Sequence, residues 1–406
     1  MSRATARMRG GRIRVAQVVT RFIAGAGGVA LRGAMGLDPE RFESTIVTAP
    51  GGSLIDQAAA AGLEVLTLRH MRPNIAPSDD VAGVRELRAL FDVGRFDVVH
   101  THSSKAGVLG RIAAHEAHVP AVVHTFHGFP FHDFQSPVRR GAYIAAERRL
   151  GRITDRFVAV CSSLANDAVH LGIAPADRVC VIPVSIADQS VARDANSRAR
   201  ARRLLGVPDD VPLVGTVGRL DYQKAPGDFL EALVHLDRGV HGVWIGDGPL
   251  SAEVAARGRL LGLGSRLHLA GERDDVPALL PGLDVFVMTS LYEGLPCAVV
   301  EAMQCGLPVV ATAVNGTPEI VIDGVTGLLI PPARPQACAA ALRRMLEYPD
   351  DARRLADAGR RAVAGRFEAG TAAAALGGVY NAALGGVYNA ALGARPDRLA
   401  LLSEAS

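Results

Sequence analysis

The sequence has little of what marks several large classes of protein. Its five cysteines are odd in number and no two have a C-x-x-C spacing, so neither a disulfide framework nor a cysteine zinc site is expected. No apolar run approaches the eighteen or more residues of a membrane-spanning helix. No long apolar core follows the N-terminal arginines, as it would in a secretory signal. We therefore expect a protein of the reducing cytoplasm.

Net charge and aromatic residues are also scarce. The net charge is +3 and aromatic residues make up 5% of the chain, which gives no support to nucleic acid as a partner. Basic residues do crowd the first fourteen positions, at Arg3, Arg7, Arg9, Arg12 and Arg14. A solvated, frayed terminus is the simpler interpretation, and peripheral contact with anionic lipid at the inner face of a membrane is the alternative.

Small apolar residues are abundant. Hydrophobic residues make up 49% of 406 residues, which suits two domains with α/β layers. Short β-branched runs alternate with helical segments such as Val81–Asp92, Ser104–Ala117 and Ser162–Leu171, as in doubly wound parallel sheets. A polar stretch over Ala187–Asp210 interrupts this alternation, and we place the interdomain connection there.

The predicted strands form two sets. The first set is Ile13–Val19, Ser44–Val47, Glu64–Leu68, Asp97–Thr101, Ala121–Thr125, Arg156–Val160 and Val179–Ile182. The second set is Leu213–Val217, Val243–Ile245, Leu267–Ala270, Val285–Thr289, Val309–Thr312 and Gly327–Ile330. We predict two facing Rossmann-like domains over 1–190 and 191–365, with the active-site cleft between them lined by strand carboxyl ends.

A C-terminal helical segment over 366–406 is predicted to follow. It holds a tandem repeat, because LGGVYNAA occupies 376–383 and again 384–391. Two copies are too few for a solenoid. We interpret the repeat as a recent local duplication.

Two glutamates bracket a strand–loop–helix in the second domain. The run Glu293-Gly-Leu-Pro-Cys-Ala-Val-Val-Glu301 follows the strand Val285–Thr289. Pro296 is expected as the first helical residue, since its fixed φ suits that place, and Gly306 stops the helix. A helix N-terminus can receive a phosphate, and carboxylates on either side suit sugar and ribose hydroxyls. The alternative is that both glutamates are solvated surface charges.

Two cations follow the first strand of the second domain. Arg219 and Lys224 stand in the run GRLDYQK, directly after Leu213–Val217. A fixed arginine and lysine stabilise the charge that develops on the β-phosphate when a nucleoside diphosphate leaves. A metal is then unnecessary, and we expect no cofactor. Two ordinary surface cations are the alternative interpretation.

Glycines and histidines gather at strand ends in the first domain. Gly25, Gly27 and Gly28 form a turn that allows close backbone approach to a phosphate, but the third glycine and the acidic residue of a dinucleotide fingerprint are missing. Histidines stand at His100, His102, His124, His127 and His132. A zinc site at His102 and His127 is one alternative. Core histidines bonded to the backbone are another, above all at His100 and His124.

These motifs resemble the retaining glycosyltransferases of family 4, also described as glycosyl transferases group 1, which have the GT-B architecture of two facing Rossmann-like domains. The E-x7-E run, the G-R-x-x-x-x-K run and the His-Gly after a first-domain strand carry the resemblance. It extends over nearly the whole chain and is more specific in the second domain. It implies an acceptor domain over 1–190 and a nucleotide-sugar donor domain over 191–365.

The resemblance also implies roles for single residues. Glu293 contacts the donor sugar with Gly294 and Leu295 beside it, Glu301 contacts the ribose, and His127 lies close to the reacting carbon. Diphosphate contacts fall on Arg219, Lys224, Gly27 and Gly28, with the N–H of Thr317 on a phosphate. Backbone at Arg273 and Val276 meets the nucleobase. His102 and Lys105 are hypothesised to meet the acceptor.

The function expected from the resemblance is transfer of a hexose-type sugar from a nucleoside diphosphate to a hydroxyl acceptor, with retention of configuration. Uridine is our first choice of base and guanosine the second. The acceptor is a lipid-linked sugar in surface-polysaccharide or glycolipid synthesis, or a small metabolite. Two other functions stay open: an epimerase or hydrolase of nucleotide sugars with the same architecture, and a non-catalytic sugar-nucleotide-binding protein.

Overall fold

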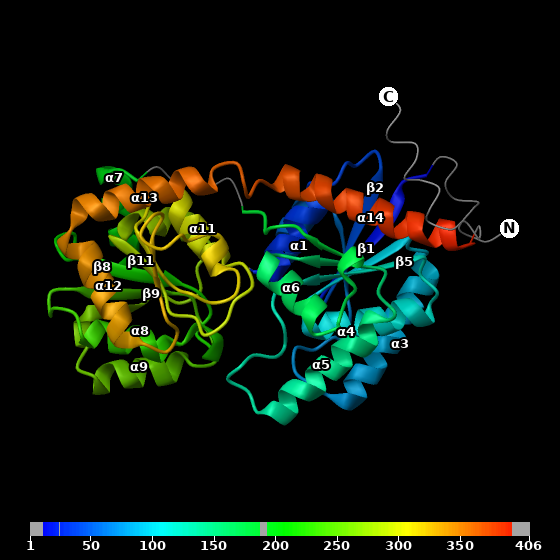
Figure 1. Cartoon of the computed structure of the whole chain (residues 1–406), viewed down its shortest axis with the longest axis horizontal. Coiled ribbons are helices and arrows are strands. Elements are labelled where there is room, and N and C mark those ends of the chain that lie inside the picture. Colours follow the sequence, from blue (N-terminus) through cyan, green and yellow to red (C-terminus); the bar gives the residue numbers. More distant parts are fainter. Residues whose placement is uncertain (1–10, 24, 187–192, 392–406) are drawn as a thin grey trace. The chain divides into compact units, whose positions relative to one another are not determined.

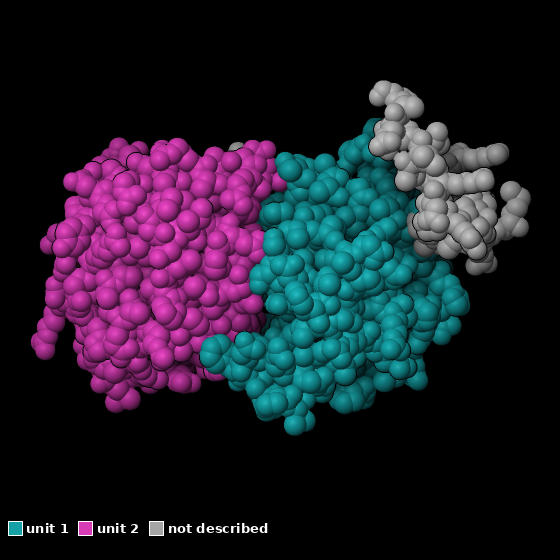
Figure 2. Space-filling model, in the orientation of Figure 1, with its two compact units in different colours: residues 1–185, 369–406 teal, residues 186–368 magenta. Residues whose placement is uncertain are grey.

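The computed structural model describes residues 11–23, 25–186 and 193–391. The chain forms two compact units (Figure 2). Unit 1 comprises Met1–Ser185 together with Ala369–Ser406, and unit 2 comprises Ile186–Glu368. The chain therefore leaves unit 1 once and returns to it, and the C-terminal segment that the sequence set apart packs with the N-terminal residues.

Unit 1 contains a seven-stranded sheet in the order β3-β2-β1-β4-β5-β6-β7, with every neighbouring pair parallel. The strands are β1 (Ile13–Val19), β2 (Phe42–Thr48), β3 (Glu64–Thr67), β4 (Val98–His102), β5 (Ala121–Phe126), β6 (Arg156–Ala159) and β7 (Val179–Val181). All seven predicted strands are confirmed, to within about two residues at their ends.

Helices cover both faces of this sheet. They are α1 (Ala26–Met35), α2 (Ile55–Ala60), α3 (Pro77–Gly94), α4 (Ser104–Glu116), α5 (Pro137–Gly151), α6 (Ser162–His170) and α14 (Ala369–Ala391). One core packs α3 and α4 on alternate residues of the central strands, including Ala16 and Val99. The opposite core packs α14 on the intervening residues, including Val15 and Val98. Figure 1 shows α14 lying beside α1, with which it is in contact.

Small residues let α4 approach the sheet closely. A Cβ at Gly107 would lie 2.6 Å from His124 Cε1, and one at Gly110 would lie 2.6 Å from Thr101 Cγ2. Real Cβ atoms do not come this near, so glycine is needed at both positions. The helix can therefore cover polar side chains at the ends of β4 and β5 without leaving a gap.

Unit 2 contains a six-stranded sheet in the order β10-β9-β8-β11-β12-β13, and its strand pairs are parallel. The strands are β8 (Leu213–Val217), β9 (His241–Ile245), β10 (Leu267–Leu269), β11 (Val285–Met288), β12 (Val309–Thr312) and β13 (Leu328–Ile330). The helices are α7 (Ala195–Leu205), α8 (Pro226–Val234), α9 (Ser251–Leu260), α10 (Val276–Leu279), α11 (Cys297–Gln304), α12 (Pro335–Glu347) and α13 (Pro349–Val363). Each predicted strand of the second set is confirmed, and two doubly wound domains are the GT-B type of fold.

The polar stretch in which we placed the interdomain connection contains α7. Asp194 and Ser197 form a capping box that starts this helix. Arg202 is fully buried and donates to the carbonyl oxygens of Gly282 and Val211 and to Asp284 Oδ2. The charged composition of this stretch gave no helical signal in the sequence. The helix nevertheless packs within unit 2, because tertiary hydrogen bonds satisfy its buried arginine. Residues 187–192 lie outside the described residues.

Within the described residues, no helix is both long and apolar enough to cross a bilayer. Of the five N-terminal arginines, Arg12 and Arg14 are described, and both lie within ion-pair distance of Glu43. The other three lie in 1–10, outside the described residues.

Candidate functional site

Predicted site residues gather at the carboxyl edge of the unit 2 sheet. The loop after β8 carries Arg219 and Lys224, and the loop after β11 carries Glu293, Gly294 and Leu295. Because β8 and β11 are parallel neighbours, their following loops meet at the same edge. Thr289 Oγ1 donates to Lys224 O at 2.9 Å, and Leu291 N donates to Gln223 O at 2.8 Å. These bonds hold the two loops against each other.

Lys224 and Glu293 are in direct contact. Lys224 Nζ lies 2.5 Å from Glu293 Oε1, although 69 residues separate them in sequence. The side chain of Glu293 is 7% exposed and that of Lys224 is 22% exposed, so solvent screens this pair less than a surface pair. Each side chain neutralises the charge of the other.

Neutral donors complete the environment of Glu293. Ser290 Oγ donates to Glu293 Oε1 at 2.6 Å, and Gln223 Nε2 donates to Oε2 at 3.3 Å. The backbone N–H of Glu293 donates to Asn315 Oδ1 at 2.9 Å, in the loop after β12. Three loops therefore fix one carboxylate at a defined place, which is the arrangement that recognition of a sugar hydroxyl needs.

Arg219 is held by an acidic neighbour. Its Nε donates to Asp221 Oδ2 at 2.6 Å, and the two side chains form an ion pair. Asp221 Oδ1 also accepts from the backbone N–H of Lys224 at 3.2 Å, which caps the short 3₁₀ turn Tyr222–Lys224. Asp221 thus links both predicted phosphate-binding cations. The Arg219 side chain is 49% exposed, so it remains open to an anion.

The helix after Glu293 begins one residue later than predicted. Pro296 is the N-cap of α11 with ψ of 102°, and the helix spans Cys297–Gln304. The prediction that Pro296 is the first helical residue is wrong, because its extended ψ places it before the first turn. Glu301 lies inside α11, as predicted, and the structure shows it half-buried. Gly306, with φ of 76°, follows the helix.

Thr317 begins the 3₁₀ turn Thr317–Glu319 after β12. Its N–H, which we assigned to a phosphate, donates to Val314 O at 2.9 Å. Its Oγ1 is buried and has no hydrogen-bond partner among the residues that the structure describes. The hydroxyl is thus the group of Thr317 that has bonding capacity left.

The loop after β10 carries the remaining predicted residues of unit 2. Arg273 is bound to Asp275 by two bonds of 2.7 Å, and Val276 is the first residue of α10. Gly246 N donates to Gly271 O at 2.8 Å, which joins this loop to the one after β9. These bonds hold the loop after β10 to itself and to the loop after β9.

In unit 1, His127 directly follows β5, and a chain of buried polar groups leads to it. His127 Nε2 lies 3.0 Å from His102 Nδ1, and His102 Nε2 lies 2.9 Å from Gln17 Oε1. Gln17 Nε2 donates to Tyr380 Oη at 2.8 Å. Tyr380 comes from α14, so the two predicted site histidines, His102 and His127, share a network with the C-terminal helix.

The strand histidines are held in the neutral form by burial. Burial lowers the pKa of His127 to about 4. Burial, with a smaller effect of His127, lowers the pKa of His100 to about 3. His100 is bonded to Tyr380 Oη and to Thr125 Oγ1, and His124 Nδ1 is bonded to Thr101 Oγ1. His100 and His124 are thus core histidines, but their partners are side chains rather than the backbone partners that we considered.

The histidines do not form a ligand set. His102 and His127 bond to each other instead of converging on one point. Among residues 11–23, 25–186 and 193–391, no group of three or more histidine, cysteine, aspartate or glutamate side chains is arranged to hold a metal ion. That the reaction proceeds without a metal remains a prediction.

The other predicted residues of unit 1 lie on α1 and α4. Gly27 and Gly28 are in the first turn of α1, after Gly25 with φ of 78°. A Cβ at Gly27 would lie 3.1 Å from Arg21 O, so the turn packs tightly on the preceding loop. Lys105, at the start of α4, donates to Asn74 O at 2.8 Å and forms an ion pair with Asp80.

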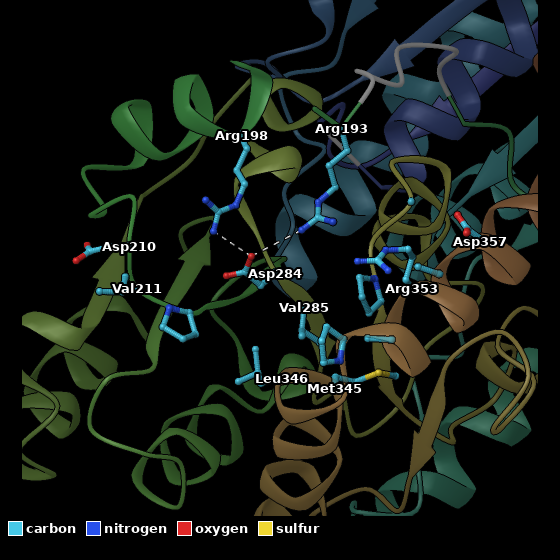
Figure 3. Close-up of a pocket in the computed structure, with 16 residues that line it drawn as sticks. Arg193, Arg198, Asp210, Val211, Asp284, Val285, Met345, Leu346, Arg353 and Asp357 are labelled. Carbon is cyan, nitrogen blue, oxygen red and sulfur yellow. Dashed lines mark hydrogen bonds and ion pairs between the residues drawn. The ribbon is translucent and has the colours of Figure 1, made fainter. Parts of the chain in front are cut away.

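A cavity of about 390 Å³ lies at the other edge of the unit 2 sheet, where Pro212, Val285 and Pro308 mark the amino ends of β8, β11 and β12. Figure 3 shows Arg193 and Arg198 reaching Asp284 beside it. None of the predicted site residues lines this cavity. The arginines there are paired with a carboxylate, so the cavity is not an anion site of the kind predicted.

Sequence reasoning missed several residues that hold the predicted ones. Ser290, Asn315 and Gln223 surround Glu293, and they could have been suspected because they are polar residues at the ends of adjacent strands. Gln17 interrupts the apolar β1, which is a second such signal. Nothing in the sequence connects Gln17 with Tyr380, which lies 363 residues away.

Comparisons with known proteins identify the family of the chain. A model described as Glycosyl transferases group 1 matches residues 197–362, and one described as Glycosyltransferase Family 4 matches residues 23–189. The chain is 31% identical over 300 residues to UDP-Gal:alpha-D-GlcNAc-diphosphoundecaprenol alpha-1,3-galactosyltransferase of Escherichia coli, covering 72% of this chain and 77% of the relative. It is 34% identical over 317 residues to the D-inositol 3-phosphate glycosyltransferase of Xylanimonas cellulosilytica, covering 74% and 75%.

Solved structures share the fold. HepE of Anabaena, solved in complex with UDP and glucose, matches with a TM-score of 0.77 at 20% identity over 90% of this chain and 99% of its own. Sucrose-phosphate synthase of Thermosynechococcus elongatus matches with a TM-score of 0.79 at 22% identity over 92% and 100%. At these identities the likeness concerns the architecture of two Rossmann-like domains.

Proposed function

This chain belongs to glycosyltransferase family 4, and from that membership we propose that it transfers a hexose-type sugar from a uridine diphosphate sugar to a hydroxyl acceptor with retention of anomeric configuration. The observation that carries the proposal is the contact of Lys224 with Glu293, because it joins a phosphate-binding cation to a sugar-binding carboxylate. One residue faces the diphosphate and the other the sugar attached to it. Guanosine is the second candidate for the base.

The donor contacts follow from this arrangement. Arg219 and Lys224 take the diphosphate, while Glu293, with Gly294 and Leu295 beside it, accepts hydrogen bonds from sugar hydroxyls. The ribose falls to Glu301. The further contacts are the base on backbone at Arg273 and Val276, and phosphate on the turn at Gly27 and Gly28. The Thr317 N–H, which the sequence assigned to a phosphate, is bonded to Val314 O instead.

The chemical step is a front-side displacement assisted by the leaving group. The bond from the anomeric carbon to the β-phosphate oxygen breaks, and the acceptor oxygen forms a bond to the same face of that carbon. The acceptor proton passes to the leaving diphosphate. Arg219 and Lys224 stabilise the developing charge electrostatically. His127, neutral at pH 7, orients a hydroxyl at the reacting centre, with His102 and Lys105 toward the acceptor.

A lipid-linked sugar is the acceptor that we propose. The Escherichia coli relative is named for an acceptor on diphosphoundecaprenol, and the other relatives are named for D-inositol 3-phosphate. The surface of α5 favours the lipid-linked class. This helix carries Arg139, Arg140, Arg148 and Arg149, while its Glu147 is buried against Arg111 at 2.8 Å.

Peripheral contact of α5 with an anionic membrane would bring such an acceptor to the enzyme. Val138 is 85% exposed at the start of α5, and Phe134 just before it is 47% exposed. Exposed apolar side chains beside arginines suit the boundary between headgroups and acyl chains. The lipid contact that we considered for the N-terminal arginines stays a prediction, and α5 is a second surface proposed for such contact.

A donor and acceptor panel tests the function. Purified full-length protein is incubated with UDP-glucose, UDP-galactose, UDP-N-acetylglucosamine and GDP-mannose, each with a polyprenyl-diphosphate sugar or with inositol 3-phosphate. We expect UDP release and a new α-linked product with the lipid-linked acceptor. Formation of an isomerised or free sugar without an acceptor product would favour the epimerase or hydrolase. Donor binding by the wild type without turnover of any donor, left unchanged by Lys224→Ala, Glu293→Ala and His127→Ala, would favour a sugar-nucleotide-binding protein.

A further inference from the structure

The tandem repeat near the C-terminus contributes Leu376, Tyr380, Ala383 and Leu384 to the core of unit 1. Tyr380, in the first LGGVYNAA copy, is fully buried in the core between α14 and the sheet. Its ring lies edge-on to Phe42, with ring centroids 5.9 Å apart. Its hydroxyl is buried too and meets two polar side chains, Gln17 Nε2 and His100 Nδ1, both at 2.8 Å. A tyrosine placed here for packing alone would not need that hydroxyl.

The partners of Tyr380 lie on one face of the sheet for a simple reason. Side chains alternate between the two faces of the sheet along each strand. The face that α14 covers therefore carries Gln17 from β1, His100 and His102 from β4, and Thr125 from β5. The register sets Gln17 opposite His100 and His102 opposite Thr125. Thr101 and His124 point to the other face, where they bond to each other at 2.8 Å.

The orientation of the Gln17 amide sets the direction of the other hydrogen bonds in this network. Gln17 Nε2 donates to Tyr380 Oη, so Gln17 Oε1 is an acceptor and His102 Nε2 carries a proton. His102 Nδ1 is then unprotonated and accepts from His127 Nε2 at 3.0 Å. A neutral imidazole with its proton on Nε2 leaves Nδ1 as its acceptor. The Tyr380 hydroxyl donates its hydrogen bond to His100 Nδ1, and His100 Nε2 donates to Thr125 Oγ1 at 2.7 Å.

We propose that Tyr380 is a positioning residue, which acts through Gln17 and His102 to hold His127 as the tautomer with its proton on Nε2 and its acceptor nitrogen, Nδ1, toward the substrate. The role of His127 toward substrate rests on the proposed function. The tautomer of His127 follows from the network alone. Removing the Tyr380 hydroxyl leaves the Gln17 amide without its acceptor, so the amide can turn over and every bond up to His127 can reverse.

We call the hydrogen-bonded series Tyr380–Gln17–His102–His127 the relay. Because it is buried, a hydrogen bond lost from it is not replaced by one to solvent. Gln17 and Tyr380 are 0% exposed and His102 is 3% exposed, so water cannot replace a lost partner at low cost. Burial also lowers the pKa of His102 well below its ordinary value, which keeps the ring neutral and so restricts it to one of two tautomers.

The tautomer can be measured without activity. Full-length protein labelled with ¹⁵N-histidine gives ring-nitrogen signals that distinguish a proton on Nε2 from one on Nδ1, and a His127→Gln variant assigns the His127 signals. In Tyr380→Phe we expect His127 to change from one tautomer to a mixture. We expect kcat to fall about tenfold, equivalent to about 1.4 kcal/mol, with little change in the KM for the donor.

Thr101→Val is the matched control, because it removes a buried hydroxyl from a histidine outside the relay. It should lose similar stability and keep the His127 signals. Gln17→Met breaks the relay with Tyr380 intact, and should reproduce the tautomer mixture even if Tyr380→Phe does not fold. Wild-type His127 signals in Tyr380→Phe or in Gln17→Met would overturn the proposal. If no nucleotide sugar is consumed by the wild type, the proposed function fails and the tautomer result still decides the positioning role.

Discussion

Lys224 and Glu293 share one short ion pair at the carboxyl edge of the unit 2 sheet, with Nζ and Oε1 2.5 Å apart. In this pair, the Lys224 ammonium group and the Glu293 carboxylate use their charges on each other. A diphosphate that binds Lys224 competes with Glu293 for the ammonium group. A sugar hydroxyl that binds Glu293 competes with Lys224 for the carboxylate. Donor binding therefore exchanges one set of charge-assisted bonds for another.

This competition predicts opposite effects on the binding of UDP alone. Glu293→Gln should bind UDP at least as tightly as the wild type, because Lys224 is released and a negative charge is removed. Lys224→Met should weaken UDP binding about 10- to 100-fold, equivalent to about 1.4–2.8 kcal/mol. Both variants should lose turnover. Titration calorimetry measures the affinities, and weaker UDP binding by Glu293→Gln would contradict the competition.

The buried histidines predict how stability depends on pH. The pKa of His100 is lowered to about 3, so the folded state leaves this ring neutral where the unfolded chain, with a pKa near 6.5, binds a proton. Its contribution is complete above pH 6.5 and is lost as the pH falls toward 3. Each such histidine contributes a slope of up to about 1.4 kcal/mol per pH unit in that window.

Urea unfolding between pH 5 and 7.5 measures this slope. The free energy of unfolding of the wild type should decrease as the pH falls below 6.5. His100→Gln should be less stable than the wild type at pH 7.5, and its stability should depend less on pH, since one titrating group has been removed. Equal slopes for the two proteins would show that His100 is not held neutral by the fold.

Arg202 should be essential for the stability of unit 2. Arg202 is 0% exposed and donates to Asp284. It also donates to four backbone carbonyl oxygens, those of Pro208, Asp209, Val211 and Gly282. Arg202→Met removes these bonds and leaves buried carbonyls unpaired, at a cost of about 3–5 kcal/mol. Arg203→Met, on the exposed side of the same helix, should change stability by less than about 0.5 kcal/mol. Thermal unfolding compares them, and equal melting temperatures would contradict the prediction.

The exposed arginines of α5 should control binding to vesicles. The double variant Arg139→Glu and Arg149→Glu should bind vesicles of anionic lipid at least about tenfold more weakly, at about 1 kcal/mol per arginine removed. Arg203→Glu with Arg361→Glu makes the same change of net charge on exposed helices of unit 2 and should bind as the wild type does. Sedimentation with vesicles measures both. Equal loss in both double variants would indicate a general effect of net charge.

Much of the fold was predictable because its signals are local. Buried parallel strands require continuous apolar, β-branched runs, and these runs located the thirteen strands of the described residues. The helix α7 was not recognised, because a charged residue such as Arg202 is expected to be exposed, whereas in the fold it is buried. The start of α11 was misplaced by one residue, since a proline suits both the N-cap and the first helical position, and only ψ separates them.

The sequence by itself determined the family, the two parallel sheets and the strand ends at which Arg219, Lys224, Glu293 and His127 stand. It could do so because each of these features depends on residues close together in the chain. Only the tertiary structure decided that Lys224 pairs with Glu293 across 69 residues, and that Tyr380 meets Gln17 across 363. Such contacts arise from which strands are neighbours and which helix returns to cover them. Hydrogen bonds and ion pairs act over a few ångströms, so their partners are set by packing in space rather than by spacing in sequence.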